Sequence, residues 1–102
     1  MSALGTELKI NVHVEPIDGI SMSEYDFECA FYVYTNKKVI INKSNMKMID
    51  DDNYIAIIES MDAMKLGRGK INLEFTGYIP DSDFTDGFRT EKAIVCTDVV
   101  IV

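Results

Sequence analysis

The chain of 102 residues has no tryptophan, one histidine and two cysteines. The single histidine, His13, leaves no second imidazole for a transition-metal site, and its place among alternating polar residues predicts a solvated surface side chain. Cys29 and Cys96 stand too far apart for a zinc-binding pair or a redox Cys-x-x-C motif. With His13 as the sole candidate base, no Ser-His-Asp or Cys-His arrangement is credible. We therefore expect a protein that is not an enzyme and that holds no metal and no cofactor.

Basic residues are also scarce. Lysine and arginine total 10 against 17 aspartates and glutamates, which gives a formal net charge of -7. The basic residues form only short local groups, at positions 37–38 and 65–70. Because phosphate neutralisation supplies most of the affinity for nucleic acid, this balance argues against a nucleic-acid partner. It argues in the same way against binding to an anionic membrane surface.

The sequence lacks long apolar runs and a leader pattern. The longest apolar run, at residues 99–102, is far too short to span a bilayer. The first residues show no basic region followed by an apolar stretch, so they predict no signal peptide. The expected compartment is the cytoplasm, where both thiols are reduced.

Apolar residues instead recur with a period of two. Leu8, Ile10, Val12 and Val14 alternate with polar residues, which predicts a half-buried strand, and Pro16 ends it because proline cannot donate to a ladder. Similar alternation predicts further strands, and a change of period after residue 59 predicts a short helical turn. Strands are expected at residues 6–15, 25–35, 38–43, 46–48, 54–58, 70–79 and 90–102, with the helical turn at 60–67.

The alternation also assigns faces to the strands. In the second strand, odd positions from 25 to 33 are apolar or aromatic and face inward, so Tyr32 and Tyr34 face outward. In the sixth strand Tyr78 faces outward. The last strand has apolar residues at both parities, which predicts a bulge near Thr97–Asp98 that switches the buried face. Residues 36–37 favour a tight turn between the second and third strands.

About seven short strands joined by turn signals predict an all-β fold, and the length predicts a single domain over residues 1–102. The expected architecture is an immunoglobulin-like antiparallel β-sandwich with one short helical turn, and a small barrel is the alternative. The usual buried tryptophan of the sandwich is missing. Cys29 and Cys96 have a spacing that resembles an inter-sheet cysteine pair, but a cytoplasmic location favours two buried free thiols.

Three polar stretches invite a ligand-binding interpretation. Residues 81–87 carry three aspartates, yet the stretch lacks the glycine and the final glutamate of an EF-hand loop, so a solvated turn is favoured over a calcium site. Residues 50–53 form a charged turn. Residues 67–70 lack the full spacing of a phosphate-binding loop and precede a strand instead of a helix.

Exposed tyrosines and the apolar C-terminal run are the best candidates for contacts with other molecules. Tyrosine offers a large contact area with a polar tip, which suits interfaces. An apolar strand edge pairs within its own sheet or with another chain. In immunoglobulin-like sandwiches the second and sixth strands lie in different sheets, so the tyrosines need not form one patch. The candidate interface residues are Tyr32, Tyr34, Tyr78, Val99, Val100, Ile101 and Val102.

Two stretches, residues 31–38 (FYVYTNKK) and 77–91 (GYIPDSDFTDGFRTE), resemble small proteins from prophage and phage tail regions of gut Bacteroides-type bacteria. The order of the parts, with residues 65–70 (KLGRGK) before the sixth strand, resembles the immunoglobulin-like N-terminal domain of phage upper baseplate proteins. The resemblance covers most of the chain. It implies a structural role in a tail, baseplate or fibre, assembled by protein–protein contacts in the host cytoplasm.

The sequence thus supports two hypotheses of function. The first is a non-enzymatic assembly module whose partners are proteins, including further copies of itself. The alternative is a β-sandwich that binds glycans or a cell surface through Tyr32, Tyr34 or Tyr78.

Overall fold

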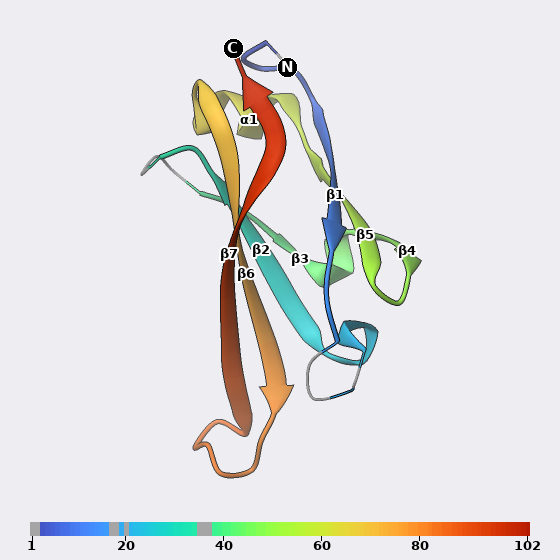
Figure 1. Ribbon diagram of the computed structural model, residues 1–102. Coiled ribbons are helices and arrows are strands. Elements are labelled where there is room, and N and C mark those ends of the chain that lie inside the picture. The colour runs from blue at the N-terminus through green and yellow to red at the C-terminus, as the bar shows by residue number, and fades with distance from the viewer. Residues whose placement is uncertain (1–2, 17–18, 20, 35–37) are drawn as a thin grey trace.

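The computed structural model describes residues 3–16, 19, 21–34 and 38–102, and at positions 95, 96 and 98 it describes the backbone. The fold is mostly β, with two antiparallel sheets that face each other and one short helix (Figure 1). The three-stranded sheet has the order β1-β5-β4 and the four-stranded sheet the order β3-β2-β6-β7. The elements are β1 (Leu8–His13), η1 (Met22–Glu24), β2 (Asp26–Tyr32), β3 (Val39–Asn42), η2 (Lys43–Asn45), β4 (Lys47–Asp50), β5 (Asn53–Ile58), α1 (Ser60–Leu66), β6 (Gly69–Pro80) and β7 (Phe88–Ile101).

The two-sheet β architecture and the short helix were both predicted from the sequence. The alternation of the residues did not predict which strands lie beside β2. Here β2 pairs with both β3 and β6. The expectation that the second and sixth strands lie in different sheets is therefore wrong. The tight turn expected at residues 36–37 lies outside the described residues.

The two cysteines belong to the same sheet, which corrects their comparison with an inter-sheet pair. Cys29 lies on β2 and Cys96 on β7, and β6 runs between these strands. The side chain of Cys29 is a free thiol with no exposed surface, as the sequence predicted for this residue. The side chain of Cys96 lies outside the described part of the structure.

The inward positions of the two sheets form one apolar core. Leu8, Ile10 and Val12 of β1 are buried, and the residues between them are exposed. This pattern confirms the half-buried strand that the period of two predicted. At the centre Phe27 meets Tyr54 edge-on across the sheets, with ring centroids 5.1 Å apart. Each large side chain buried in this way contributes about 1.5–3 kcal/mol to the free energy of unfolding.

The helix α1 closes one end of the core with Ala63 and Leu66. Gly67 ends it with a positive φ of 78°, as expected for a glycine at a helix C-terminus. Glu59, and not Ser60, occupies the N-cap position of the helix. The Ser60 hydroxyl instead donates a hydrogen bond of 2.7 Å to the carbonyl oxygen of Gly5, which fastens the N-terminal segment to the helix.

A predicted bulge interrupts β7. Ile71 of β6 stands opposite residues 97–99, and the Thr97 hydroxyl donates to the Ile71 carbonyl oxygen at 2.8 Å. The bulge was therefore predicted at the right place. Because it adds two residues to β7, the strand keeps its parity, and the expected switch of the buried face is wrong. Ala93 lies opposite inward-facing Phe75, and Val99 and Ile101 pack toward the same core.

Candidate docking surface

The longest strand of the fold, β7, is an edge strand of the four-stranded sheet. It has 14 residues and lies at the end of the four-stranded order, where β6 is its neighbour on one side. An edge strand leaves alternate N–H and C=O groups pointing away from its sheet, where another chain can pair with them. With β6, β7 forms a long hairpin that extends beyond the other strands (Figure 1).

The two halves of β7 differ in accessibility. At the C-terminal half the bulge disturbs the regular spacing of the outward-pointing groups, and such bulges discourage pairing with another strand. The N-terminal half, residues 88–94, is regular, and we call it the open edge. It contains no proline, and its charged residues Arg89, Glu91 and Lys92 sum to a single positive charge in an acidic chain.

Two residues of the apolar run at the C-terminus, Val99 and Ile101, pack toward the core. Ile101 is 2 % exposed, and Val99 packs partly buried against the core. Val100 lies opposite Lys70 of β6. Val102 is exposed, and its carbonyl oxygen accepts a 3.1 Å hydrogen bond from the backbone N–H of Leu4. Of the two halves of β7, the open edge is thus better placed to meet another chain.

The outer face of the four-stranded sheet, turned away from the three-stranded sheet, adjoins the open edge. One cross-strand row on this face runs from Ile40 on β3 through Ala30 and Glu74 to Ile94 on β7. Ile40 is 60 % exposed and Ile94 is 68 % exposed. Isolated exposed isoleucines are common, but Ile94 stands directly on a strand edge, where a pairing chain would cover it.

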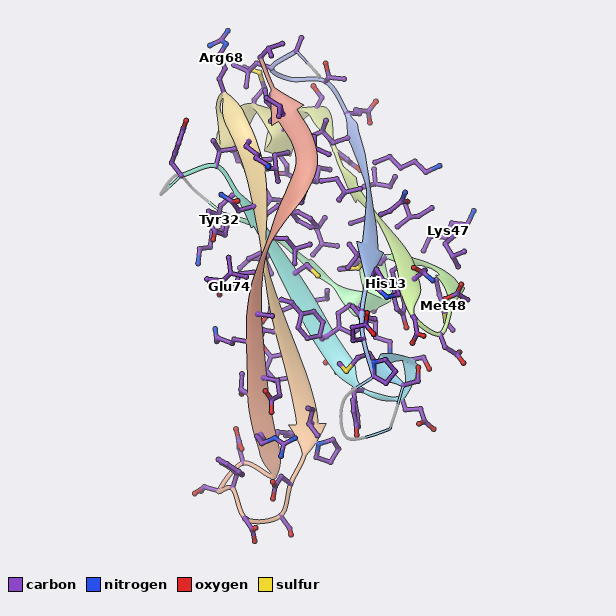
Figure 2. All side chains as sticks on the ribbon, viewed as in Figure 1. His13, Tyr32, Lys47, Met48, Arg68 and Glu74 are labelled. Carbon is purple, nitrogen blue, oxygen red and sulfur yellow. The ribbon has the colours of Figure 1, made fainter. Side chains whose placement is uncertain are left out.

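Charged residues are matched across the same face. The Glu74 carboxylate lies 3.5 Å from the Lys38 ammonium and 3.4 Å from that of Lys92. Lys38 also lies over the ring of Tyr32, 5.4 Å from its centroid. Attraction to Lys38, with a further contribution from Lys92, lowers the pKa of Glu74. Figure 2 shows Tyr32 and Glu74 on the side of the molecule opposite His13 and Lys47.

The three candidate tyrosines do not form one patch. Tyr32 and Tyr78 lie on the same outer face, but Tyr32 pairs with Asn72 while Tyr78 pairs with Asp26, at the other end of β2. This six-residue offset separates them by about 20 Å. The hydroxyl of Tyr78 donates to the Glu28 carboxylate, and this hydrogen bond raises the pKa of Tyr78.

Tyr34 stands apart from the outer face and is the most exposed tyrosine among the candidates. It follows β2 with a positive φ of 52°, and 74 % of its surface is accessible. A side chain added at Gly69 would meet the Tyr34 ring and would collide with Val33 at 2.6 Å. Gly69 therefore permits the close approach that positions this tyrosine.

His13 lies on the outer face of the three-stranded sheet, where the sequence placed it. Its Nδ1 is 2.9 Å from the Asn53 side-chain oxygen, and its Nε2 is 3.0 Å from a Glu15 carboxylate oxygen. The hydrogen bond to Asn53, followed by that to Glu15, raises the pKa of His13. Its partners are solvated surface groups, so the arrangement is an exposed polar cluster.

The acidic loop between β6 and β7 uses its carboxylates to hold its own backbone. Asp81 accepts a hydrogen bond from the N–H of Asp83, and Asp86 accepts one from that of Phe88. Gly87 has a φ of 82°, which closes the turn. Among the residues that the structure describes, we find no group of three or more histidine, cysteine, aspartate or glutamate side chains that could hold a metal ion.

No protein-family model matches the chain, and neither the curated proteins nor the solved structures gave a match. In the described part of the chain, no helix has the length and apolar character needed to cross a membrane.

Proposed function

We propose that this protein is a non-enzymatic assembly module that docks onto other protein subunits through the open edge of β7 and the adjoining outer face. One observation carries the proposal: a regular edge segment lies at the outer side of the four-stranded sheet and carries Ile94, which is 68 % exposed. Strand addition at such an edge draws affinity from backbone hydrogen bonds and specificity from alternate side chains.

The charge distribution supports protein over nucleic acid as the partner. The chain has a net charge of -7, whereas the open edge carries two basic residues and one acidic residue. A nearly neutral edge in an acidic protein admits another polypeptide strand without strong repulsion at the contact. The acidic remainder of the surface disfavours phosphate backbones and anionic membranes.

The sequence resemblance to phage tail and baseplate proteins is the support for placing this module in a virion or tail structure. On that basis the protein would remain in the host cytoplasm until assembly. An immunoglobulin-like ancestry belongs to the same proposal. It rests on the two facing antiparallel sheets, whose orders β1-β5-β4 and β3-β2-β6-β7 correspond to B-E-D and C′-C-F-G of an immunoglobulin domain when β1 is taken as strand B.

A glycan-binding module is the second candidate, and the exposure of Tyr34 favours it. An accessible aromatic ring offers a platform for the apolar face of a sugar. The competing cation–π contact with Lys38 covers one face of Tyr32, and the Glu28 hydrogen bond occupies the Tyr78 hydroxyl. Tyr34 is therefore the residue on which this alternative depends.

Light scattering combined with saccharide titration separates the two candidates. The assembly module predicts a molar mass that rises with concentration in the micromolar to millimolar range and no saccharide affinity. The glycan-binding module predicts a monomer at every concentration and a saccharide affinity that Tyr34→Ala abolishes. That second pattern would contradict the proposed function.

A further inference from the structure

Resting on the proposed function, we infer that the partner at the open edge is a second copy of this chain. The β7 strand of the second copy would pair antiparallel with the β7 strand of the first copy. The two-fold axis would pass between the two Thr90 residues, which would lie directly opposite each other. The two four-stranded sheets would then form one continuous sheet of eight strands. Two-fold pairing is the commonest symmetry of soluble homo-oligomers, and an isologous contact requires a surface that complements itself.

The charges of the open edge complement themselves about Thr90. Antiparallel pairing around this residue places Arg89 of one chain opposite Glu91 of the other, and the reverse contact follows from symmetry. Within one chain Arg89 and Glu91 already lie on the same face, with Nε and Oε1 3.1 Å apart. The pair would thus become a four-charge cluster with alternating signs, which is the favourable arrangement for opposed strands.

The other face of the edge also pairs favourably in this register. Phe88 and Lys92 lie on the outer side together with Thr90, since alternate residues share a face. Two-fold pairing at Thr90 sets the Phe88 ring, which is 46 % exposed, opposite the Lys92 side chain of the other chain. A lysine ammonium near an aromatic face gains a cation–π attraction.

Neighbouring registers are less favourable for identifiable reasons. An axis at Glu91 would oppose two glutamates, and an axis at Lys92 would oppose two lysines; both arrangements are destabilising. An axis at Ala93 would set the Lys92 charge against Ile94. An axis at Ile94 would place Glu91 opposite the partner's bulge at Thr97, where regular pairing stops.

Disulfide trapping tests this register directly. Directly opposed residues in an antiparallel pair have Cα atoms about 4.5–5.5 Å apart, which suits a disulfide bond. Thr90→Cys, in a Cys96→Ser background, is expected to form a covalent dimer under mild oxidation. Cys29 does not compete because its thiol is fully buried. Ile94→Cys in the same background is the matched control, since the Thr90 axis places its two copies about 27 Å apart.

Charge exchange between Arg89 and Glu91 provides a second test. Arg89→Glu puts like charges opposite each other and is expected to weaken the dimer about tenfold. The double variant Arg89→Glu/Glu91→Arg restores opposite signs and should restore the affinity.

The outcomes separate this inference from the proposed function. Trapping at residue 90 but not at 94, together with rescue by the double variant, supports the two-fold pairing. An oligomer that traps at 94, or that fails to trap at 90, overturns the pairing and leaves the assembly role intact. A wild-type chain that is monomeric at every concentration and binds saccharide through Tyr34 would overturn both.

Discussion

Glu74 of β6 lies directly opposite Ile94 of β7 on the outer face of the four-stranded sheet, and the two side chains have contrasting environments. Glu74 is held between Lys38 and Lys92, whereas Ile94 is 68 % exposed at the sheet edge. Glu74 thus has charged partners within the chain, whereas Ile94 at the sheet edge remains exposed. That contrast directs attention to β7 as the place where another chain would add surface.

Thr90→Lys is expected to abolish self-association while leaving the domain folded. The two-fold axis at residue 90 would set the two new lysines directly opposite each other, and like charges in opposed positions are destabilising. As Thr90 is exposed, the substitution should change the free energy of unfolding by no more than about 0.5 kcal/mol. Sedimentation velocity measures the association, and urea unfolding measures the stability.

Ile57→Lys is the matched control for that experiment. Ile57 is 49 % exposed on the outer face of the three-stranded sheet, opposite Lys9 of β1, away from the proposed interface. The control should associate like the wild type. Equal loss of association in both variants would indicate a general effect of added charge and would argue against a role for the edge.

Lys43→Met is expected to destabilise the domain by about 1.5–3 kcal/mol. The Lys43 ammonium donates to the carbonyl oxygens of Met22 and Ser23, at 3.3 and 2.6 Å, and also to that of Tyr25. It therefore ties η1 and the start of β2 to η2. Urea unfolding at neutral pH measures the loss.

Lys47→Met, on exposed β4, controls for the removal of a positive charge. It should leave the free energy of unfolding within about 0.5 kcal/mol of the wild type. A Lys43→Met variant that is as stable as this control would show that water replaces the ammonium without cost.

The Cys29 thiol is expected to resist alkylation in the native protein. Burial raises the pKa of Cys29 to about 12, so the reactive thiolate is scarce at neutral pH, and the side chain has no exposed surface. In a Cys96→Ser variant, iodoacetamide should label Cys29 only after unfolding in urea. Rapid labelling of the folded protein, monitored by mass spectrometry, would disprove this burial.

His13 is expected to titrate above its ordinary pKa of 6.5 because its protonated ring donates to Asn53 and Glu15. A raised folded-state pKa means that the stabilisation is complete below the unfolded value and is lost as pH rises through the folded value. Proton NMR of the imidazole measures the pKa directly. Asn53→Ala should lower it, and an unchanged pKa in that variant would show that the hydrogen bond has no influence.

Local features of the fold could be predicted from the sequence because they depend on neighbouring residues. The alternation of Leu8, Ile10 and Val12 identified a half-buried strand, and the change of period after residue 59 located the short helix. The two competing apolar parities in the last strand located the bulge at Thr97. They did not show how many residues the bulge contains, and that number decides which face is buried.

Relationships between distant residues could not be predicted in the same way. Alternation shows which side of a strand is buried but not which strand lies beside it, so the pairing of β2 with β6 was missed. No local pattern distinguishes Lys43, whose carbonyl partners lie about twenty positions earlier, from other lysines. The apolar residues Val99 and Ile101 drew attention to the chain end, whereas the accessible edge begins near Phe88.

Amide hydrogen exchange along β7, measured at low and high protein concentration, tests the central claim most directly. Outward-pointing amides in residues 88–94 exchange readily from a free edge, and pairing with a second chain would protect them. The account predicts that exchange in this segment slows as concentration rises, while exchange in β1 and β5 stays constant. Exchange along residues 88–94 that is fast and independent of concentration would contradict docking of a second copy at this edge.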